Sequence, residues 1–221
     1  MESMEVKVKF FQRHPFLQDV LSLILFVVCV VVGTLALNAL VFRSYNVVGS
    51  SMENTMHNGD RIIVNRLTVS AAHFLGNEYV PERGQVIVFM NGAADGPLTC
   101  SVQPGVSDQY IIKRVIAFPG ERVTVKNGEV RVYNEENPDG FDPDEATRKS
   151  ETDGPKTGTT GEVDVTVAEG ELFVMGDNRT NSDNGNPHSF DSRYGLGTVP
   201  YCRVIGPVVF RLFPFNTIRW F

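Results

Sequence analysis

The stretch that decides the fold class is ERVTVKNGEVRVY, residues 121–133. Its valines alternate with polar residues on both sides of Asn127-Gly128, and this dipeptide between alternating segments is the strongest short signal for a β-hairpin. Further short segments rich in Val, Ile and Phe flank it: QVIVFM (85–90), QYIIKRVIAF (109–118), EVDVTV (162–167), LFVMG (172–176) and YCRVIGPVVF (201–210). No helical pattern longer than two turns follows residue 43, so the sequence predicts a mostly β fold with an all-β domain over residues 44–221.

Two segments between these strands look like insertions. The first, 91–108, is rich in Gly, Pro, Ser and Asp. The second, 134–162, is longer and acidic, and it has almost no large apolar residues. Because it cannot bury much apolar surface, we expect an exposed, loop-rich lobe or a disordered loop there.

A long apolar segment precedes the β domain. VLSLILFVVCVVVGTLALNALVF, residues 20–42, carries no charge. At ~1.5 Å per residue it reaches about 34 Å, enough to cross a hydrocarbon core of ~30 Å. A cleavable signal peptide has a shorter apolar region, of about 7–15 residues, and an A-x-A site that is absent here. A buried helix is the other alternative, but we expect a single transmembrane helix over residues 17–43.

The charges around this helix predict its orientation. Lys7, Lys9 and Arg13 precede it, whereas Arg43 is the nearest basic residue beyond it. The positive-inside rule therefore places residues 1–16 in the cytoplasm and the β domain outside the cell membrane. The net charge of −6 argues against a nucleic-acid partner, which would favour a basic surface.

Candidate chemistry does not centre on the histidines. The chain has His14, His57, His73 and His188, without metal-ligand spacing or partner cysteines, so we predict no metal and no cofactor. Lys113 is more unusual, since Ile111 and Val115 flank it on its own face of the strand. Burial lowers a lysine pKa, and a neutral lysine can activate a serine nucleophile. The alternative is a lysine that extends to the rim of the sheet.

Four sequence boxes carry a family resemblance. GSSMENTMHNGD (49–60), RGQVIVF (83–89), IKRVIAFPGE (112–121) and MGDNRTNSDNGNPHSFDSRYGLG (175–197) occur in this order after one apolar segment. Together they resemble bacterial type I signal peptidase, a membrane-bound Ser/Lys endopeptidase, from about residue 43 to the end. Asn54, Met56, Ala117-Phe118 and the long gap between Ser182 and Asp191 depart from the usual pattern.

The resemblance implies roles for individual positions. Ser51 matches the nucleophile, Lys113 the general base, and Ser182 the hydroxyl that orients the lysine. The backbone N–H of Ser51 is the first oxyanion donor. The second donor stays open between a backbone group and Ser50, because Gly49 stands where some members carry a serine.

The resemblance also implies substrate and partners. Substrate pockets are expected at Val47, Met52, Met56, Ile111 and Ile112, and a structural ion-pair network at Asp177, Arg179, Asp191 and Arg193. The expected substrates are preproteins with small-x-small cleavage sites, with the lipid bilayer as a partner and the secretion translocon nearby. Two alternatives are an inactive membrane-anchored binding module and a self-cleaving repressor-like Ser/Lys protease, which would lack the span.

The cysteines and the C-terminal tail give two further expectations. Cys29 lies in the span, whereas Cys100 and Cys202 both lie outside, where they could form a disulfide or stay two separate thiols. The tail FRLFPFNTIRWF (210–221) has more aromatic residues than one strand face can bury. We expect Phe213, Phe215 and Trp220 to form an apolar patch that faces the bilayer.

Overall fold

We analysed a computed structural model that describes residues 15–92, 100, 108–147, 158–180 and 191–221. The chain divides into two compact units, residues 1–41 and 42–221. The first contains α2 (Pro15–Ala36), followed by one π-helical turn, Leu37–Val41. Phe16–Ala36 is long and apolar enough to cross a membrane. The helical segment ends slightly before the predicted boundary, because residue 42 already begins a strand.

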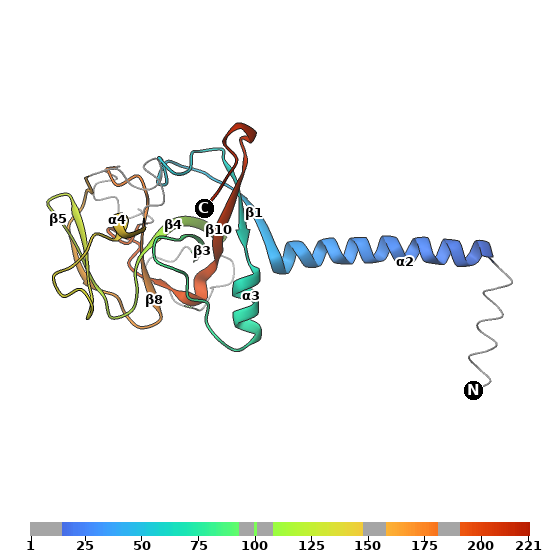
Figure 1. Cartoon of the computed structure of the whole chain (residues 1–221), viewed down its shortest axis with the longest axis horizontal. Helices are drawn as coiled ribbons and strands as arrows, with labels where there is room; N and C mark the ends of the chain where they lie inside the picture. The colour runs from blue at the N-terminus through green and yellow to red at the C-terminus, as the bar shows by residue number, and fades with distance from the viewer. Residues whose placement is uncertain (1–14, 93–99, 101–107, 148–157, 181–190) are drawn as a thin grey trace. The chain divides into compact units, whose positions relative to one another are not determined.

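The second unit is built mainly from an eight-stranded sheet (Figure 1). Its strands follow the order β1 (Phe42–Asn46), β2 (Arg61–Asn65), β10 (Val204–Phe213), β3 (Val86–Gly92), β4 (Asp108–Ala117), β8 (Glu171–Met175) and β9 (Val199–Pro200). The last strand, β11 (Arg219–Trp220), pairs with β10. Neighbouring strands are antiparallel. Because β10 pairs with β2 on one side and with β3 on the other, it joins the first two strands of the chain to the strands that follow.

A three-stranded sheet contains the predicted hairpin. Its order is β6 (Glu129–Tyr133), β5 (Arg122–Lys126) and β7 (Val163–Thr166). Asn127 and Gly128 connect β5 to β6 with φ of 53° and 84°, and a two-residue turn of type I′ needs positive φ at both positions. The hairpin prediction is confirmed.

The mostly β prediction is confirmed, but the domain also contains short helices. These are α3 (Leu67–Phe74), α4 (Pro143–Thr147) and the 3₁₀ turns Tyr201–Arg203 and Phe215–Thr217. Only Val69 of α3 is buried, so the helix has no apolar repeat that its sequence could reveal. The strand expected from residue 201 begins at Val204 instead, after the 3₁₀ turn.

Three apolar clusters form the core. One joins β3, β4 and β8 around Ile87, Phe89 and Val115. A second fills the three-stranded sheet with alternating valines, and a third lies between β2, β3 and the loop that follows β1. This third cluster contains Val47, Met52 and Met56, so the loop is packed against the sheet.

The described parts of the two predicted insertions do not form a separate lobe. Phe141 pairs with Val132 and packs against the second cluster, and Asp144 of α4 is buried. The first part of segment 134–162 is therefore attached to the domain. Within 91–108, Cys100 forms a disulfide with Cys202, with a Cα–Cα distance of 5.7 Å.

Candidate active site

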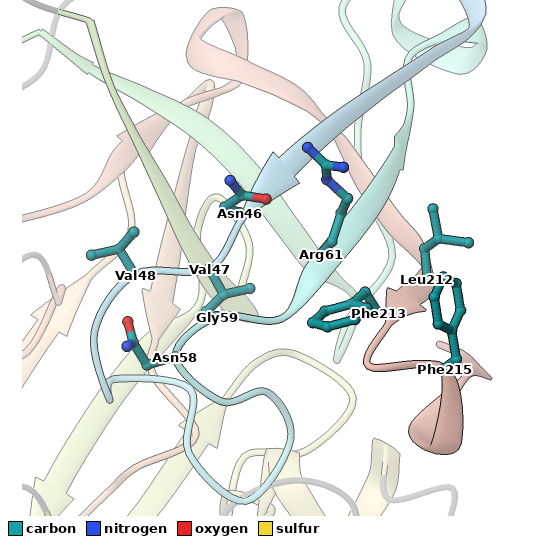
Figure 2. Close-up of a pocket in the computed structure, with 9 residues that line it drawn as sticks. All are labelled: Asn46, Val47, Val48, Asn58, Gly59, Arg61, Leu212, Phe213 and Phe215. Atoms are coloured by element: carbon teal, nitrogen blue, oxygen red, sulfur yellow. The ribbon is translucent and has the colours of Figure 1, made fainter.

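The loop between β1 and β2, part of which is drawn in Figure 2, is fixed by three hydrogen bonds at its base. The N–H of Val47 donates to the carbonyl of Asp60 (2.8 Å), and the N–H of Gly59 donates to the carbonyl of Val47 (2.9 Å). The N–H of Gly49 donates to Oδ1 of Asn58 (3.0 Å). Gly49 has a φ of 95°, in the left-handed region that favours glycine, so the chain turns sharply just before the serines.

The turn that follows exposes Ser51. The N–H of Glu53 donates to the carbonyl of Ser50 (3.0 Å), and that of Met56 donates to the carbonyl of Met52 (2.8 Å). Met52 and Met56 are buried in the third apolar cluster, whereas Ser51 is exposed. The methionines hold the turn on the core, and the serine between these anchors faces outward.

Lys113 approaches this turn from the centre of the sheet. It lies on β4 opposite Ile87 of β3, on the face that also carries Phe89 and Val115 of the first cluster. The residue is only 3% exposed. Of the two interpretations of the sequence, a buried lysine or a lysine that extends to the rim of the sheet, the structure shows the first.

Gly176, directly after β8, brings the serine and the lysine together. A Cβ atom on this glycine would lie under 3.0 Å from the carbonyl oxygen of Ser51 and 3.5 Å from Nζ of Lys113. Both groups are thus immediate neighbours of the same point. Only a residue without a side chain leaves room for them there.

Asn178 holds the serine turn from the same side. Its N–H donates to the carbonyl of Ser51 (3.0 Å), and its Nδ2 donates to the carbonyl of Ser50 (3.1 Å). The segment after β8 therefore contacts both serines through backbone groups. It sets the position of their peptide units relative to Lys113.

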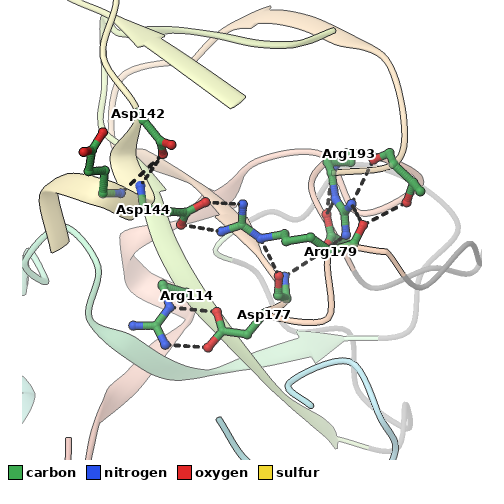
Figure 3. A network of polar contacts seen from close by, with 10 residues as sticks. Arg114, Asp142, Asp144, Asp177, Arg179 and Arg193 are labelled. Carbon is green, nitrogen blue, oxygen red and sulfur yellow. Dashed lines mark hydrogen bonds and ion pairs between the residues drawn. The ribbon is translucent and has the colours of Figure 1, made fainter. Parts of the chain in front are cut away.

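Buried charged side chains support the segment that follows β8 (Figure 3). Asp177 is fully buried and accepts hydrogen bonds from the Nε of Arg114 (2.7 Å), from a second nitrogen of the same guanidinium, and from the hydroxyl of Thr55. Thr55 belongs to the loop of Ser51, and Arg114 follows Lys113. One carboxylate therefore links the two elements that carry the candidate residues.

Arg179 is the largest fully buried side chain among the residues that the structure describes. It donates two hydrogen bonds to Asp144 (2.6 and 2.7 Å) and one to the carbonyl of Gly176 (2.7 Å). Burial raises the pKa of Asp144, although the charge of Arg179 opposes that rise.

Asp191 holds the other side of Gly176, since it accepts a hydrogen bond from the N–H of this glycine (2.8 Å). Burial acts to raise the pKa of Asp191, but hydrogen bonds and charge from Arg193, and the charge of Lys113, leave that pKa below its usual value. Lys113, the candidate base, is thus one of the cations whose charge acts on Asp191. Arg193 in turn donates to the carbonyl of Arg179 (3.0 Å), which closes the network.

The structure assembles most of the predicted site residues. Asp177, Arg179, Asp191 and Arg193 form one buried network, and Val47, Met52 and Met56 share a cluster against which Ile112 packs. Ile111 packs against the first cluster instead. Ser182 lies outside the described residues.

Several residues of the site were not found from the sequence. Gly176 and Asn178 flank Asp177 in the quoted box, and a small residue at the end of an apolar strand was the available signal. Asp144 gave none, because it meets Arg179 from a segment 35 residues away in the chain. Asn58 lies in the quoted GSSMENTMHNGD box but had no assigned role.

Comparisons with known proteins show the family of the chain. The family described as "Signal peptidase, peptidase S26" matches residues 17–213. Signal peptidase I of Bacillus amyloliquefaciens is 32% identical over 194 residues, which cover 87% of this chain and 85% of the relative. Signal peptidase I T of Bacillus subtilis (strain 168) is 31% identical with the same coverage.

A solved structure gives a weaker comparison. A signal peptidase I from Enterococcus faecalis is 26% identical, covers 59% of this chain and 98% of its own, and has a TM-score of 0.37. The assignment rests on the family match over residues 17–213 and on the Bacillus relatives. The chain belongs to the signal peptidase family, peptidase S26.

Proposed function

We propose that this chain is a membrane-anchored serine endopeptidase that removes signal peptides from preproteins, with Ser51 as nucleophile and Lys113 as general base. The observation that carries this proposal is the convergence of the Ser51 peptide unit and the Lys113 amine on Gly176. A buried amine beside an exposed serine is the pairing that serine activation without histidine requires.

The first step is acylation. Neutral Lys113 takes the proton of the Ser51 hydroxyl as its oxygen attacks the scissile carbonyl carbon. The resulting oxyanion is stabilised by the N–H of Ser51, with the second donor from a neighbouring backbone N–H or from Ser50. When the scissile C–N bond breaks, the lysine returns the proton to the leaving amine, which is the new N-terminus of the mature protein.

The second step is deacylation. A water molecule loses a proton to Lys113 and attacks the acyl carbon, and the serine oxygen leaves with that proton. The signal peptide departs with a free carboxylate. Ser182 is proposed to orient the lysine in both steps.

The substrate backbone is proposed to bind beside the loop that precedes the serines. Val48 is 87% exposed. It follows β1, which lies at the edge of the sheet, so the outer side of this strand could pair with a further strand. The buried Val47, Met52 and Met56 and the nearby Ile112 are proposed to limit the substrate side chains to small ones, with Ile111 further along the same strand.

The proposed topology places residues 1–16 in the cytoplasm, the span over α2, and the β domain on the outer side near the secretion translocon. Support comes from the basic residues that precede the span and from the apolar helix itself. Phe213, Phe215 and Trp220 are 46%, 71% and 75% exposed, which supports the proposed patch that faces the bilayer.

The test is cleavage of a purified preprotein by the full chain in detergent. Ser51→Ala and Lys113→Met should each abolish cleavage with a near-normal melting temperature, because methionine keeps much of the lysine volume. Lys126→Met is the matched control, since this lysine lies exposed on the three-stranded sheet. Full activity of Lys113→Met would refute the dyad, and binding of preprotein without any cleavage by the wild type would favour a binding module instead.

A further inference from the structure

An open cleft of about 600 Å³ lies on the side of β1, β2 and β10. Its volume is in the range of small-molecule sites. Its lining is part apolar and part polar. The apolar residues are Val47 and Val48 on one side and Leu212, Phe213 and Phe215 on the other, and the remaining residues are Asn46, Asn58, Gly59 and Arg61 (Figure 2).

A cross-strand row places polar and aromatic residues of the cleft beside each other. Asn46 of β1 is paired with Arg61 of β2, and Arg61 is paired with Phe213 of β10. Directly paired residues of antiparallel strands lie on the same face of a sheet. An amide, a guanidinium and an aromatic ring therefore stand side by side across three strands.

Arg61 has a guanidinium available for a ligand. It is exposed and has no ion pair with any residue that the structure describes. The adjacent carboxylate, Asp60, is buried and already bound by Arg211 (3.0 Å). The positive charge at the cleft is therefore not neutralised by the adjacent Asp60.

The same face of the sheet exposes large apolar side chains. Phe42, Phe213 and Trp220 are 47%, 46% and 75% exposed. Contiguous exposed aromatics beside arginine are typical of a membrane–water interface. Phe42 directly follows the helical segment, and β1 covers about 17 Å at ~3.3 Å per residue, so Asn46 can lie no further than about 17 Å along the chain from residue 41.

We propose that this cleft binds one anionic phospholipid. The lipid phosphate pairs with Arg61 and accepts a hydrogen bond from the amide of Asn46, and one acyl chain lies along Phe213 and Phe215. The proposal rests on the membrane anchoring in the proposed function. The whole chain has a net charge of −6, so a preference for anionic lipid has to come from this local site and not from general attraction.

The experiment uses Trp220, the only tryptophan of the chain, as an internal reporter. The full chain with Ser51→Ala, which needs no catalysis, is reconstituted in phosphatidylcholine vesicles. Brominated phosphatidylglycerol or brominated phosphatidylcholine is then added at equal mole fraction, and the quenching of Trp220 fluorescence is measured. Flotation of the vesicles checks separately that the protein is anchored.

We expect brominated phosphatidylglycerol to occupy the site about five-fold more strongly than brominated phosphatidylcholine, the effect of one arginine at an anionic headgroup. Arg61→Gln should remove this preference and Arg61→Lys should keep most of it. Arg131→Gln, which removes an equal charge from the exposed face of β6, should leave it unchanged.

The following results would overturn the proposal. They are equal quenching by both lipids, a preference that survives Arg61→Gln, an equal loss in Arg131→Gln, and displacement of the lipid by excess inorganic phosphate, which would indicate a simple anion site. Anchored protein without any quenching of Trp220 would also overturn it, while the proposed anchoring and dyad would stand.

Discussion

Substitution of Gly176 by alanine tests the site at its most crowded point. The added Cβ would lie under 3.0 Å from the carbonyl oxygen of Ser51, a separation that real Cβ atoms essentially never show. The obstructing atom belongs to the backbone, so it cannot rotate away as a side chain would. Gly176 is not in the left-handed region, and the effect of alanine is therefore purely steric.

The structure indicates how large the effect should be. To reach an ordinary van der Waals distance, the Ser51 carbonyl and the new methyl group must separate by about 1 Å more. A misplacement of about 1 Å at a reacting group reduces catalysis by roughly 10²-fold. Overpacking of this kind destabilises a fold by about 1–3 kcal/mol, so most of the protein would stay folded.

The assay compares kcat/KM for an internally quenched preprotein peptide with the melting temperature of the same sample. Gly76→Ala is the matched control. This glycine follows α3 with a φ of 73° and no atom within 4 Å of its Cβ position. Alanine there introduces backbone strain of about 1–2 kcal/mol without touching the site.

We expect Gly176→Ala to lose about 100-fold in kcat/KM, and Gly76→Ala to lose less than about two-fold at a similar loss of stability. Activity of Gly176→Ala within a few-fold of the wild type would refute the reasoning. It would mean that catalysis does not depend on the meeting of serine and lysine at this glycine.

Three further predictions concern the surroundings of the site. Asp144→Asn leaves Arg179 buried without its counter-charge, so it should destabilise the domain by about 3–5 kcal/mol. The melting temperature should fall by roughly 10 °C, and an unchanged melting temperature would contradict the role of this pair. Reduction of the Cys100–Cys202 disulfide, which spans 102 residues, should destabilise by up to about 4–5 kcal/mol in the chain-entropy model, measured by denaturant unfolding with and without reductant. Asp191→Asn removes a carboxylate that favours the charged form of the nearby lysine, so the acid limb of the pH–activity profile should move about one unit toward lower pH. Because the pKa of Asp191 lies below its usual value, the wild type keeps this carboxylate charged over about pH 6–9, so profiles over this range compare folded proteins. An acid limb that moves upward would contradict the prediction.

The sequence predicted the elements whose local pattern agrees with their final environment. The hairpin of β5 and β6 has alternating valines and an Asn-Gly turn, and both features reappear as buried residues and positive φ. The branched residues around Lys113 left two interpretations open, burial or extension to the rim of the sheet, and the structure shows the buried lysine. In each case the neighbours along the chain are also the neighbours in space.

The sequence did not predict elements that depend on distant partners. β1, FRSYN, has no apolar alternation, because one face is open and its pairing comes from β2. Similarly, the acidic segment that contains Asp144 has the composition of an exposed loop, yet it carries the carboxylate that pairs with Arg179. No local pattern records a pairing between two segments that lie far apart in the chain.

The position of the buried charges is best explained by their effect on one peptide segment. Buried ion pairs contribute little net stability, because desolvation offsets most of the attraction. Here, however, Asp191 binds the N–H of Gly176 and Arg179 binds its carbonyl, while Asp177 ties the next residue to Arg114. Both peptide groups of the glycine at which the serine turn and the lysine meet are therefore fixed. A charged network at this place makes physical sense as a support that holds the reacting groups in position, which is what a preorganised site requires of the residues behind it.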